Sequence, residues 1–408
     1  MKYLFVHNNF PGQFLHLAGF LSGIEDNEVV FVSEFARTDI QLKAVRTLRV
    51  EAIPSIDSNN EPQKALLENF ARALHYGKVF QDLSREGWIP DVIVEHAGWG
   101  AGMFMADIFP LALRISYFEW FYTKGAYFNF FAREQAREGL EFAANRQRNL
   151  CQLDALNECH IGITPTFWQY SQYPSQYAYK MRVIHDGIDT DFFTPSVING
   201  AAVKPPAIGE LDISGMEEIV TYSARGMEPT RGYPSFYAAL PKILDERPGC
   251  HVIIMANDSC HYVAERKDGK GWGAFMREQI AVDPARVHVL PYGSYTTYLS
   301  LLQASDLHVY LTAPFVLSWS LLEAMSCGCL VLASDTEPVR EVMRHTHNGF
   351  LTSFFDSEEI ARSAIRILES REQFGEVRES ARKTVLDRYD VKNSVNQFIH
   401  LLRGQVGH

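Results

Sequence analysis

Short apolar runs recur along the chain, and longer stretches with helical spacing of apolar residues lie between them. Runs of four to eight residues bounded by Gly, Pro, Asn or Asp are typical of buried strands. Strands that alternate with helices predict an α/β protein with doubly wound parallel sheets. The strands we expect are residues 2–7, 29–33, 91–96, 160–164, 182–189, 219–223, 252–256, 287–290, 307–312 and 329–334.

These runs fall into two groups, which indicates two domains. The length of 408 residues agrees, because roughly 150 residues per domain gives two or three domains. Residues 196–218 include Pro205, Pro206 and three glycines, which favours a linker or surface excursion. The division that we expect is 1–195, a linker at 196–218, a second domain at 219–388 and a C-terminal helix from 389 to 408.

Glycines and a histidine gather where two strands of the first half end. Gly12 follows the strand 2–7, and His96 and Gly98 follow the strand at 91–96, in the stretch HAGWGAGMF. Open α/β sheets bind ligands at this edge, and glycines let the backbone approach a substrate closely. The alternatives are a tight turn at Gly12 and a packed His96. The G-x-G-x-G spacing lacks the full dinucleotide fingerprint, so a nicotinamide dehydrogenase is the least favoured class.

Residues 117–131 are the most aromatic part of the chain, with aromatic side chains at nine of fifteen positions. Such a segment suits stacking on a sugar, a lipid pocket or contact with a membrane surface. Burial in a core is the alternative.

The second half places two cations at the end of a strand. In SARGMEPTRGYPSF, Arg225 and Arg231 flank a loop that contains Gly and Pro. A guanidinium stays charged and offers a planar fork of donors, so such a pair suits a diphosphate. A surface ion pair is the alternative for either arginine taken alone.

Residues 310–334 combine a strand, a polar loop, a short helix and a second strand. Ser318 is the expected helix cap, and unpaired amides at a helix start favour an anionic ligand. Glu323 lies in the second turn. The alternative is that Ser318 only caps the helix and that Glu323 is solvated. At two neighbouring strand ends, Asn257 is placed to border a donor, and Tyr292 to border a base or to be an ordinary loop residue.

Four separated motifs carry a resemblance to a known family. They are FVHNNFPGQFLHLA at 5–18, VIHDGIDTDFFTP at 183–195, SARGMEPTRGYPSF at 223–236 and LSWSLLEAMSCGCLVLASDTEPVREV at 317–342. In their order and spacing, the chain resembles the retaining glycosyltransferases of family 4, which have the GT-B fold. It is most similar to the subgroup with PFVLSWSLLEAM-like segments.

The resemblance implies two Rossmann-like domains facing across a cleft, with the C-terminal helix packing back on the first. It implies that Arg225 and Arg231 bind the leaving diphosphate and that Glu323 binds the ribose, with Ser318, Leu317 and Trp319 assigned to the donor site. Glu119 stands where many members place a histidine near the reaction centre, and we assign it to the catalytic centre together with His96. The acceptor is expected near Gly12, Gly98 and the aromatic segment.

The sequence departs from the family pattern at two positions. Phe315 occupies the place of the first glutamate of the E-x7-E segment, which in the family contacts the donor sugar. Arg231 stands where the family usually has a lysine, which preserves the charge. The first departure leaves open which hydroxyls of the sugar are recognised.

Composition narrows the choice of partners. With 38 basic and 49 acidic residues, the net charge of -11 argues against nucleic acid as a partner. The six cysteines show no C-x2-C pair, and Asp189 and Asp191 lie in an interdomain motif, so we expect no metal and no cofactor. No run approaches the roughly 20 apolar residues of a membrane span. A cytoplasmic protein is expected, free or peripheral at the inner face of the membrane.

The function predicted from sequence is transfer of a hexose-type sugar from a nucleotide diphosphate sugar to an acceptor, with retention of anomeric configuration. The acceptor classes that we expect are polysaccharide, glycolipid and metabolite. A catalytically silent nucleotide-sugar sensor or scaffold is an alternative, favoured by Phe315. An epimerase or a phosphorylase of the same architecture is another.

Overall fold

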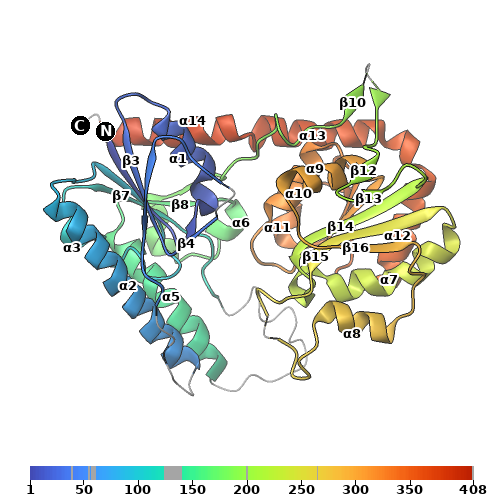
Figure 1. Cartoon of the computed structure of the whole chain (residues 1–408), viewed down its shortest axis with the longest axis horizontal. Helices are drawn as coiled ribbons and strands as arrows, with labels where there is room; N and C mark the ends of the chain where they lie inside the picture. Colours follow the sequence, from blue (N-terminus) through green and yellow to red (C-terminus); the bar gives the residue numbers. More distant parts are fainter. Residues whose placement is uncertain are drawn as a thin grey trace. The chain divides into compact units, whose positions relative to one another are not determined.

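The computed structural model describes residues 1–37, 40–53, 56, 61–123, 140–198, 201–263 and 265–406. The chain forms two compact units. The first comprises Met1–Gly187 with Val391–His408, and the second comprises Ile188–Asp390. Each unit is built around its own parallel sheet (Figure 1).

The sheet of unit 1 has seven strands in the order β5-β3-β1-β6-β7-β8-β9. All neighbouring strands are parallel. A short parallel pair, β2 (Asn9–Phe10) and β4 (Phe35–Ala36), lies beside it. The strands are β1 (Lys2–Val6), β3 (Glu28–Ser33), β5 (Val45–Arg49), β6 (Val92–His96), β7 (Leu113–Tyr117), β8 (Ile161–Thr164) and β9 (Met181–Val183).

Helices cover both faces of this sheet (Figure 1). Val92 and Val94 of β6 pack with α1 and α14 on one face, whereas Ile93 packs with α2 and α3 on the other. This alternation follows from the two-residue period of a strand. The helices are η1 (Gly12–Phe14), α1 (Leu15–Ser22), α2 (Glu61–Arg85), α3 (Met105–Ile108), α5 (Leu140–Glu158), α6 (Phe167–Tyr170), η2 (Ser175–Lys180) and α14 (Val391–Val406).

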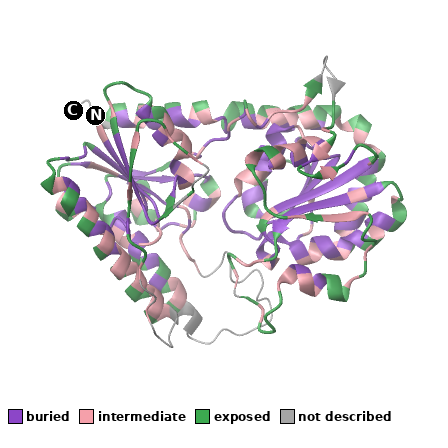
Figure 2. Cartoon of the chain, in the orientation of Figure 1, coloured by how far each residue is buried: buried purple, intermediate pink, exposed green. Residues whose placement is uncertain are grey.

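The sheet of unit 2 has six strands in the order β16-β15-β14-β17-β18-β19, again all parallel. Two short antiparallel hairpins precede it, β10 (Val197–Ile198) with β11 (Ala201–Ala202) and β12 (Ala207–Ile208) with β13 (Leu211–Asp212). The sheet strands are β14 (Glu218–Gly226), β15 (Cys250–Asn257), β16 (Val287–Leu290), β17 (Leu307–Tyr310), β18 (Val331–Ser334) and β19 (Phe350–Thr352). Figure 2 shows that most residues of these strands are buried.

The helices of unit 2 also lie on both faces of its sheet. Helices α9, α10 and α13 contribute to one apolar cluster with Ile219, Ile253 and Val331. Helix α7 packs against α12 on the other face. The helices are η3 (Pro229–Arg231), α7 (Tyr233–Glu246), α8 (Trp272–Gln279), α9 (Tyr295–Ala304), α10 (Trp319–Ser326), α11 (Glu337–Arg340), α12 (Ser357–Glu369), η4 (Arg371–Phe374) and α13 (Gly375–Arg388).

Both sheets reverse their strand order in the middle, between β1 and β6 in unit 1 and between β14 and β17 in unit 2. In open α/β sheets, ligands bind outside the carboxyl ends of the strands at such a switch point. The fold therefore directs attention to the residues that follow these four strands.

The structural division differs from the boundaries expected from sequence. Unit 2 begins at Ile188 rather than after 195. Residues 196–218 are part of unit 2, because Ile208 and Ile213 are buried in its core. Proline and glycine content suggested a linker, but the apolar positions between them pack against α9. The helix α14 belongs to unit 1, where Phe398 and Leu402 join the core.

Candidate functional site

At the switch point of unit 2, Arg231 joins the segment after β14 to the segment after β17. It ends the short helix η3, and its Nη1 donates a hydrogen bond of 2.8 Å to Thr312 Oγ1, two residues after β17. Arg231 is only 9% exposed. No carboxylate of the described residues forms an ion pair with it. Burial lowers the pKa of Arg231, but Tyr310, Tyr262 and Glu228 raise it more, so the guanidinium stays charged.

An aromatic side chain that the sequence did not single out lies over this cation. The guanidinium carbon of Arg231 is 5.1 Å from the centre of the Tyr262 ring. The Tyr262 ring in turn meets the ring of Phe315 edge to face, with centroids 5.4 Å apart. Tyr262 comes from a loop between β15 and α8 that has no apolar periodicity, so no pattern in the sequence marks it.

Glu228 fixes that loop. Its Oε2 accepts the backbone N–H groups of His261 and Tyr262 at 3.1 and 2.9 Å. Glu228 is fully buried, and its Oε1 has no hydrogen-bond partner among the described residues. The sequence shows this glutamate within SARGMEPTRG, but nothing in its spacing predicts the contact.

Arg225 differs from Arg231 in its surroundings. It lies near the end of β14 and is exposed. Within the described part of the chain it forms no ion pair. The two predicted cations therefore lie at the ends of one strand-loop-helix segment, Arg225 exposed to solvent and Arg231 buried and held by neighbours.

The residues at the start of α10 have unequal roles. Ser318 caps the helix, because its side chain accepts the backbone N–H of Ser320 at 3.4 Å, and its own N–H donates to Tyr310 Oη at 3.1 Å. Trp319 is half-buried. Leu317 is 7% exposed and packs in the core, so its side chain offers little surface to a ligand.

Glu323 is buried on α10 rather than solvated, with an exposure of 6%. Burial raises the pKa of Glu323 to about 7, and the Tyr298 hydroxyl offsets part of this rise. A carboxyl group with such a pKa changes its charge near neutral pH, which makes it sensitive to the hydroxyls of a ligand.

Asn257 and Tyr292 meet at the ends of β15 and β16. The Tyr292 N–H donates to Asn257 Oδ1 at 3.1 Å, and the Tyr292 side chain is 49% exposed. The neighbouring Asp258 accepts the backbone N–H groups of Gly273 and Ala274 at 2.7 and 2.8 Å. Asp258 therefore holds the start of α8, and Tyr292 is the more accessible group.

In unit 1, His96 lies at the switch point and faces Glu119. His96 Nδ1 accepts the Gly98 N–H at 3.1 Å, which places the proton of the neutral ring on Nε2. This Nε2 is 3.5 Å from Glu119 Oε2 and is buried without a closer partner among the described residues. The ring stacks on Trp99 with centroids 4.3 Å apart. The structure thus brings the two predicted residues together.

A chain of hydrogen bonds extends this pair to two residues that the sequence did not suggest. His7 Nε2 and Gln13 Oε1 are 2.7 Å apart, and Gln13 Nε2 donates to Glu119 Oε1 at 3.2 Å. Burial, and then the charge of His96, lowers the pKa of His7 to about 3, so this ring stays neutral. Their position after β1, at the same switch point as His96, is the signal that could have identified them.

Gly12 and Gly98 pack directly against these two rings. A Cβ atom on Gly12 would lie 2.6 Å from His7 Nε2, and one on Gly98 would lie 2.9 Å from His96 Cε1. Gly12 also has a φ of +53°, in the left-handed region. Both glycines therefore make room for histidines of this unit.

Amide side chains hold the start of the aromatic segment. Gln169 donates to the Glu119 carbonyl oxygen at 2.7 Å, and Asn149 exchanges two hydrogen bonds with the backbone of Tyr122. Phe118 and Trp120 are buried, which agrees with the core alternative for this part. The remainder of the aromatic segment, 124–131, lies outside the described residues.

A cavity lies beside the hydrogen-bonded chain in unit 1. Its volume is about 50 Å³, and its lining combines apolar residues of the sheet and of α14 with Gln13, Tyr117, His185 and Asp186. The Tyr117 hydroxyl donates to Asp186 Oδ2 at 3.1 Å. Gln13 belongs to both features, so this cavity adjoins the Glu119 and His96 pair.

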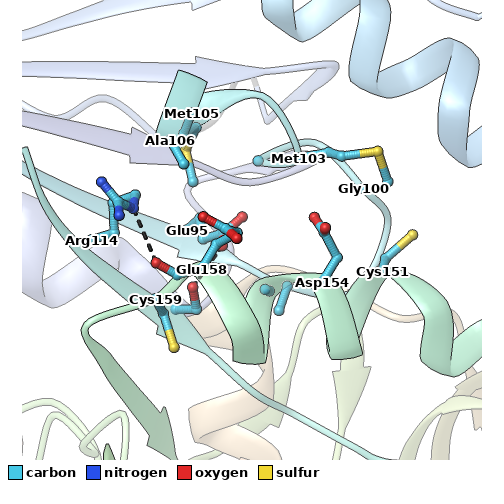
Figure 3. Close-up of a pocket in the computed structure, with 14 residues that line it drawn as sticks. Glu95, Gly100, Met103, Met105, Ala106, Arg114, Cys151, Asp154, Glu158 and Cys159 are labelled. Atoms are coloured by element: carbon cyan, nitrogen blue, oxygen red, sulfur yellow. Dashed lines mark hydrogen bonds between the residues drawn. The ribbon is translucent and has the colours of Figure 1, made fainter. Parts of the chain in front are cut away.

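A second, smaller cavity lies in unit 1, on the face of β6 that carries Glu95 (Figure 3). The acids Glu95, Asp154 and Glu158 line it, and its volume of about 10 Å³ has room for about one water molecule. Glu95 is 5% exposed and accepts a hydrogen bond of 2.6 Å from Ser116. Burial raises the pKa of Glu95 to about 7, against the Ser116 hydrogen bond, while Asp154 raises it and Arg114 lowers it. The sequence shows this acid inside an apolar strand.

Other predicted features have structural roles. Asp189 Oδ1 accepts the Phe192 N–H at 3.0 Å, as expected for a turn. Cys327 and Cys329 are buried thiols. Within the described ranges, no three His, Cys, Asp or Glu side chains converge as a metal site would require. Nor does any helix there have the length and apolarity needed to cross a membrane.

Comparison with known proteins identifies the family. A model described as glycosyl transferase family 4 group matches residues 25–193, and one described as glycosyl transferases group 1 matches residues 204–384. The chain belongs to the family 4 glycosyltransferases, and its two Rossmann-like units are those of the GT-B fold.

Curated relatives match over shorter stretches. The N-acetyl-alpha-D-glucosaminyl L-malate synthase of Bacillus anthracis is 30% identical over 110 residues, which are 27% of this chain and 29% of that protein. The phosphatidyl-myo-inositol mannosyltransferase of Mycolicibacterium smegmatis is 28% identical over 154 residues, 37% of this chain and 36% of that protein. The matched stretches thus span about a third of these relatives.

Solved structures are similar over the whole chain. HepE from Anabaena, in complex with UDP-glucose, has a TM-score of 0.71 and 17% identity, covering 99% of this chain and 100% of that chain. Sucrose-phosphate synthase from Thermosynechococcus elongatus has a TM-score of 0.74 and 14% identity, covering 100% and 99%. At these identities the likeness shows the fold.

Proposed function

We propose that the protein transfers a hexose-type sugar from a nucleotide diphosphate sugar to an acceptor hydroxyl, with retention of configuration and without a metal. The observation that carries this proposal is Arg231, a buried permanent cation at a sheet switch point that has no ion pair with a described carboxylate. Burying a charge is costly unless a partner compensates it. Tyr310, Tyr262 and Glu228 already favour the charge of Arg231, and a diphosphate would add the direct ion pair that this cation lacks among the described carboxylates. The exposed Arg225 provides a second positive charge for the diphosphate.

Transfer places negative charge on the departing diphosphate while the anomeric carbon becomes positively charged. Fixed donors aimed at the developing charge accelerate such a step, and losing one costs on the order of a hundredfold in rate. In this chain, Arg231, Arg225 and the amides at Ser318 would stabilise the leaving group, and Glu323 would bind the ribose. Tyr292 would border the base, and Asn257 the donor.

The acceptor hydroxyl would bind at Glu119 and His96. Glu119 is partly exposed, with 35% of its side chain accessible, and it accepts hydrogen bonds when ionised. The adjoining cavity beside Gln13 and Tyr117 has an apolar lining, which favours an acceptor with an apolar portion next to its hydroxyl. Retention is proposed from the family resemblance.

UDP is the first nucleotide to test, because HepE was crystallised with UDP-glucose. Thermal shifts are measured with UDP, GDP and ADP on the wild type, on Arg231→Ala and on Arg340→Ala, each relative to its own baseline. Arg340 pairs with Asp335 on the surface of unit 2 and serves as the matched control. We expect a shift in the wild type and the control that disappears in Arg231→Ala. The absence of any shift in the wild type would reject the donor site.

Turnover separates the enzyme from the silent sensor that Phe315 suggests. An enzyme releases the nucleoside diphosphate from its sugar donor, whereas a sensor binds the donor and leaves it intact. An epimerase would convert one nucleotide sugar into another without net release of nucleotide. Quantifying nucleoside diphosphate and nucleotide sugar in the same reaction therefore distinguishes all three.

A further inference from the structure

We propose that Tyr262 is a positioning residue of the donor site, which holds the Arg231 guanidinium against the diphosphate and is itself anchored by the Glu228 carboxylate. This inference rests on the proposed function, and it adds two residues that neither the sequence patterns nor the family resemblance assign. All its components lie in unit 2.

The first step is the fixation of Arg231. Thr312 accepts a hydrogen bond from Nη1, and the Tyr262 ring lies 5.1 Å from the guanidinium carbon. A free arginine side chain has about 2 kcal/mol of rotamer entropy to lose on binding. Two fixed contacts remove much of that cost before a ligand arrives. A guanidinium has five N–H donors, so these contacts leave donors for phosphate oxygens.

The second step is the fixation of Tyr262, which lies on a loop between the end of β15 at Asn257 and the start of α8 at Trp272. Glu228 Oε2 accepts the N–H groups of both His261 and Tyr262. Phe315 meets the Tyr262 ring at an angle of 63°. Glu228 therefore holds the backbone of the loop, and Phe315 packs against the Tyr262 ring.

The third step concerns the charge of Glu228. A neutral side-chain amide oxygen would also accept hydrogen bonds from the two N–H groups. Burying a carboxylate costs far more free energy than burying such an amide. Glu228 nevertheless is fully buried, and its negative charge is one of the groups that raise the pKa of Arg231. It therefore serves the loop through hydrogen bonds and the cation through longer-range attraction.

Phe315 completes the arrangement. It stands where the family pattern has an acid that contacts the donor sugar. An aromatic residue at 315 packs against Tyr262 instead. The ring that lies over Arg231 is thus itself packed against a second ring.

The test measures binding affinity by isothermal titration calorimetry with UDP, GDP and ADP. The nucleoside monophosphate that corresponds to the tightest of these ligands is then titrated as well. Tyr262→Leu removes the ring, Tyr262→Phe keeps it, and Phe355→Leu, an exposed aromatic of the same unit, is the control. We expect Tyr262→Leu to weaken diphosphate affinity by about 5- to 30-fold, between the values of an exposed and a desolvated cation–π contact. Monophosphate affinity should change much less. Tyr262→Phe keeps the ring but removes the hydroxyl, which also favours the Arg231 charge, so it should retain more diphosphate affinity than Tyr262→Leu.

A double-mutant cycle with Arg231→Ala shows whether the effect passes through the guanidinium. In the Arg231→Ala background, Tyr262→Leu should cause no further loss of diphosphate affinity. Unchanged affinity in the single Tyr262→Leu variant would overturn the inference. So would an equal loss for diphosphate and monophosphate, because this would indicate a general disturbance of the fold.

Glu228 is tested with a conservative pair. Glu228→Gln keeps an oxygen for the two N–H groups and should retain more diphosphate affinity than Glu228→Ala. Wild-type affinity in both would remove Glu228 from the site. A wild type that binds none of the three diphosphates would reject the proposed function itself, whereas normal wild-type binding that ignores Tyr262 would reject this inference alone.

Discussion

The side-chain amide of Gln13 donates a hydrogen bond of 3.2 Å to Glu119 Oε1, joining residues 106 positions apart in the sequence. The direction of this bond follows from the hydrogen bonds that His7 makes. The Asn9 N–H donates to His7 Nδ1 at 2.8 Å, so the proton of the neutral His7 ring is on Nε2. That proton is donated to Gln13 Oε1, and the Gln13 NH2 group is thereby turned to Glu119.

From this series of hydrogen bonds, we predict that Gln13 orients Glu119 for the acceptor. Gln13→Leu should lower the rate of transfer by roughly tenfold to a hundredfold, the value of a lost hydrogen bond to a charged group. Nucleoside diphosphate affinity should stay unchanged, because the donor residues belong to unit 2. Nucleotide release from the donor is the measurement, and Gln81→Leu, exposed on α2, is the control. Wild-type turnover in Gln13→Leu would exclude this role.

Gly12 offers a matched test of the crowding around His7. Gly12 and Gly87 both have positive φ values, of +53° and +76°, but only Gly12 would place a Cβ atom against a neighbour. Gly87→Ala should lose about 1 to 2 kcal/mol from its backbone conformation alone. Gly12→Ala should lose more, because the added methyl group would lie 2.6 Å from the His7 ring. Urea unfolding measures both, and equal losses would show that the ring yields without cost.

The sequence predicted most strands of the two sheets, because strands that are buried on both faces form apolar runs, but it missed β5, β7 and β19. The runs expected at 287–290 and 307–312 correspond closely to β16 (Val287–Leu290) and β17 (Leu307–Tyr310). Strand ends then drew attention to Arg231 and His96, since the carboxyl edge of a parallel sheet follows from strand order. Glu119, which follows β7, was assigned from the family resemblance, because no strand was expected before it. Tyr262 could not be found this way, because its contact with Arg231 depends on how a loop without periodicity returns to the sheet.

Burial of acids was also beyond the sequence. Glu323 was expected to bind ribose, with a solvated helix position as the alternative. Its exposure of 6% excludes the solvated alternative. In the sequence, Glu95 is a single polar residue within an apolar strand. The cavity beside it becomes visible only when α3 and α5 pack around it in the structure. The pKa of a carboxyl group depends on this three-dimensional desolvation, which pattern and spacing do not report.

Glu95 should make the protein less stable as pH rises. The pKa of Glu95 is raised from 4.5 to about 7 in the folded protein. Between these values the folded state binds more protons than the unfolded state, so the free energy of unfolding falls as pH rises and becomes level above about 7. Glu95→Gln removes this dependence. Its stability relative to wild type should increase by roughly 3 kcal/mol from pH 4.5 to pH 8.

Chemical denaturation at several pH values measures the difference for Glu95→Gln. Glu86→Gln is the control, because Glu86 is an exposed acid paired with Arg46 in the same unit. Its difference from wild type should be nearly constant over this range. A pH-independent difference for Glu95→Gln as well would mean that Glu95 is solvated in the folded protein.

Glu323 should make donor binding depend on pH in the opposite sense. Burial raises the pKa of Glu323 to about 7, and the ionised carboxylate is the form that accepts hydrogen bonds from ribose hydroxyls. UDP affinity should therefore rise as pH passes about 7, being roughly tenfold lower at pH 6 than at pH 8. Glu323→Gln should reduce this slope. UDP changes its own ionisation identically in both titrations, so equal slopes would exclude ribose binding by this carboxylate.

Substitutions of Arg225 and Arg231 should both lower diphosphate affinity, but only that of Arg231 should also lower the stability of the fold. Arg225 is exposed, so Arg225→Met should change the free energy of unfolding by less than about 0.5 kcal/mol while lowering diphosphate affinity. Arg231 is buried and charged, and its surroundings favour that charge, so Arg231→Met should cost about 1.5 to 3 kcal/mol of stability in addition to affinity. Denaturation without ligand and titration with UDP measure the two quantities. If Arg225→Met kept wild-type affinity, the diphosphate would be held by the fixed cation alone, and the exposed arginine would have no part in the donor site.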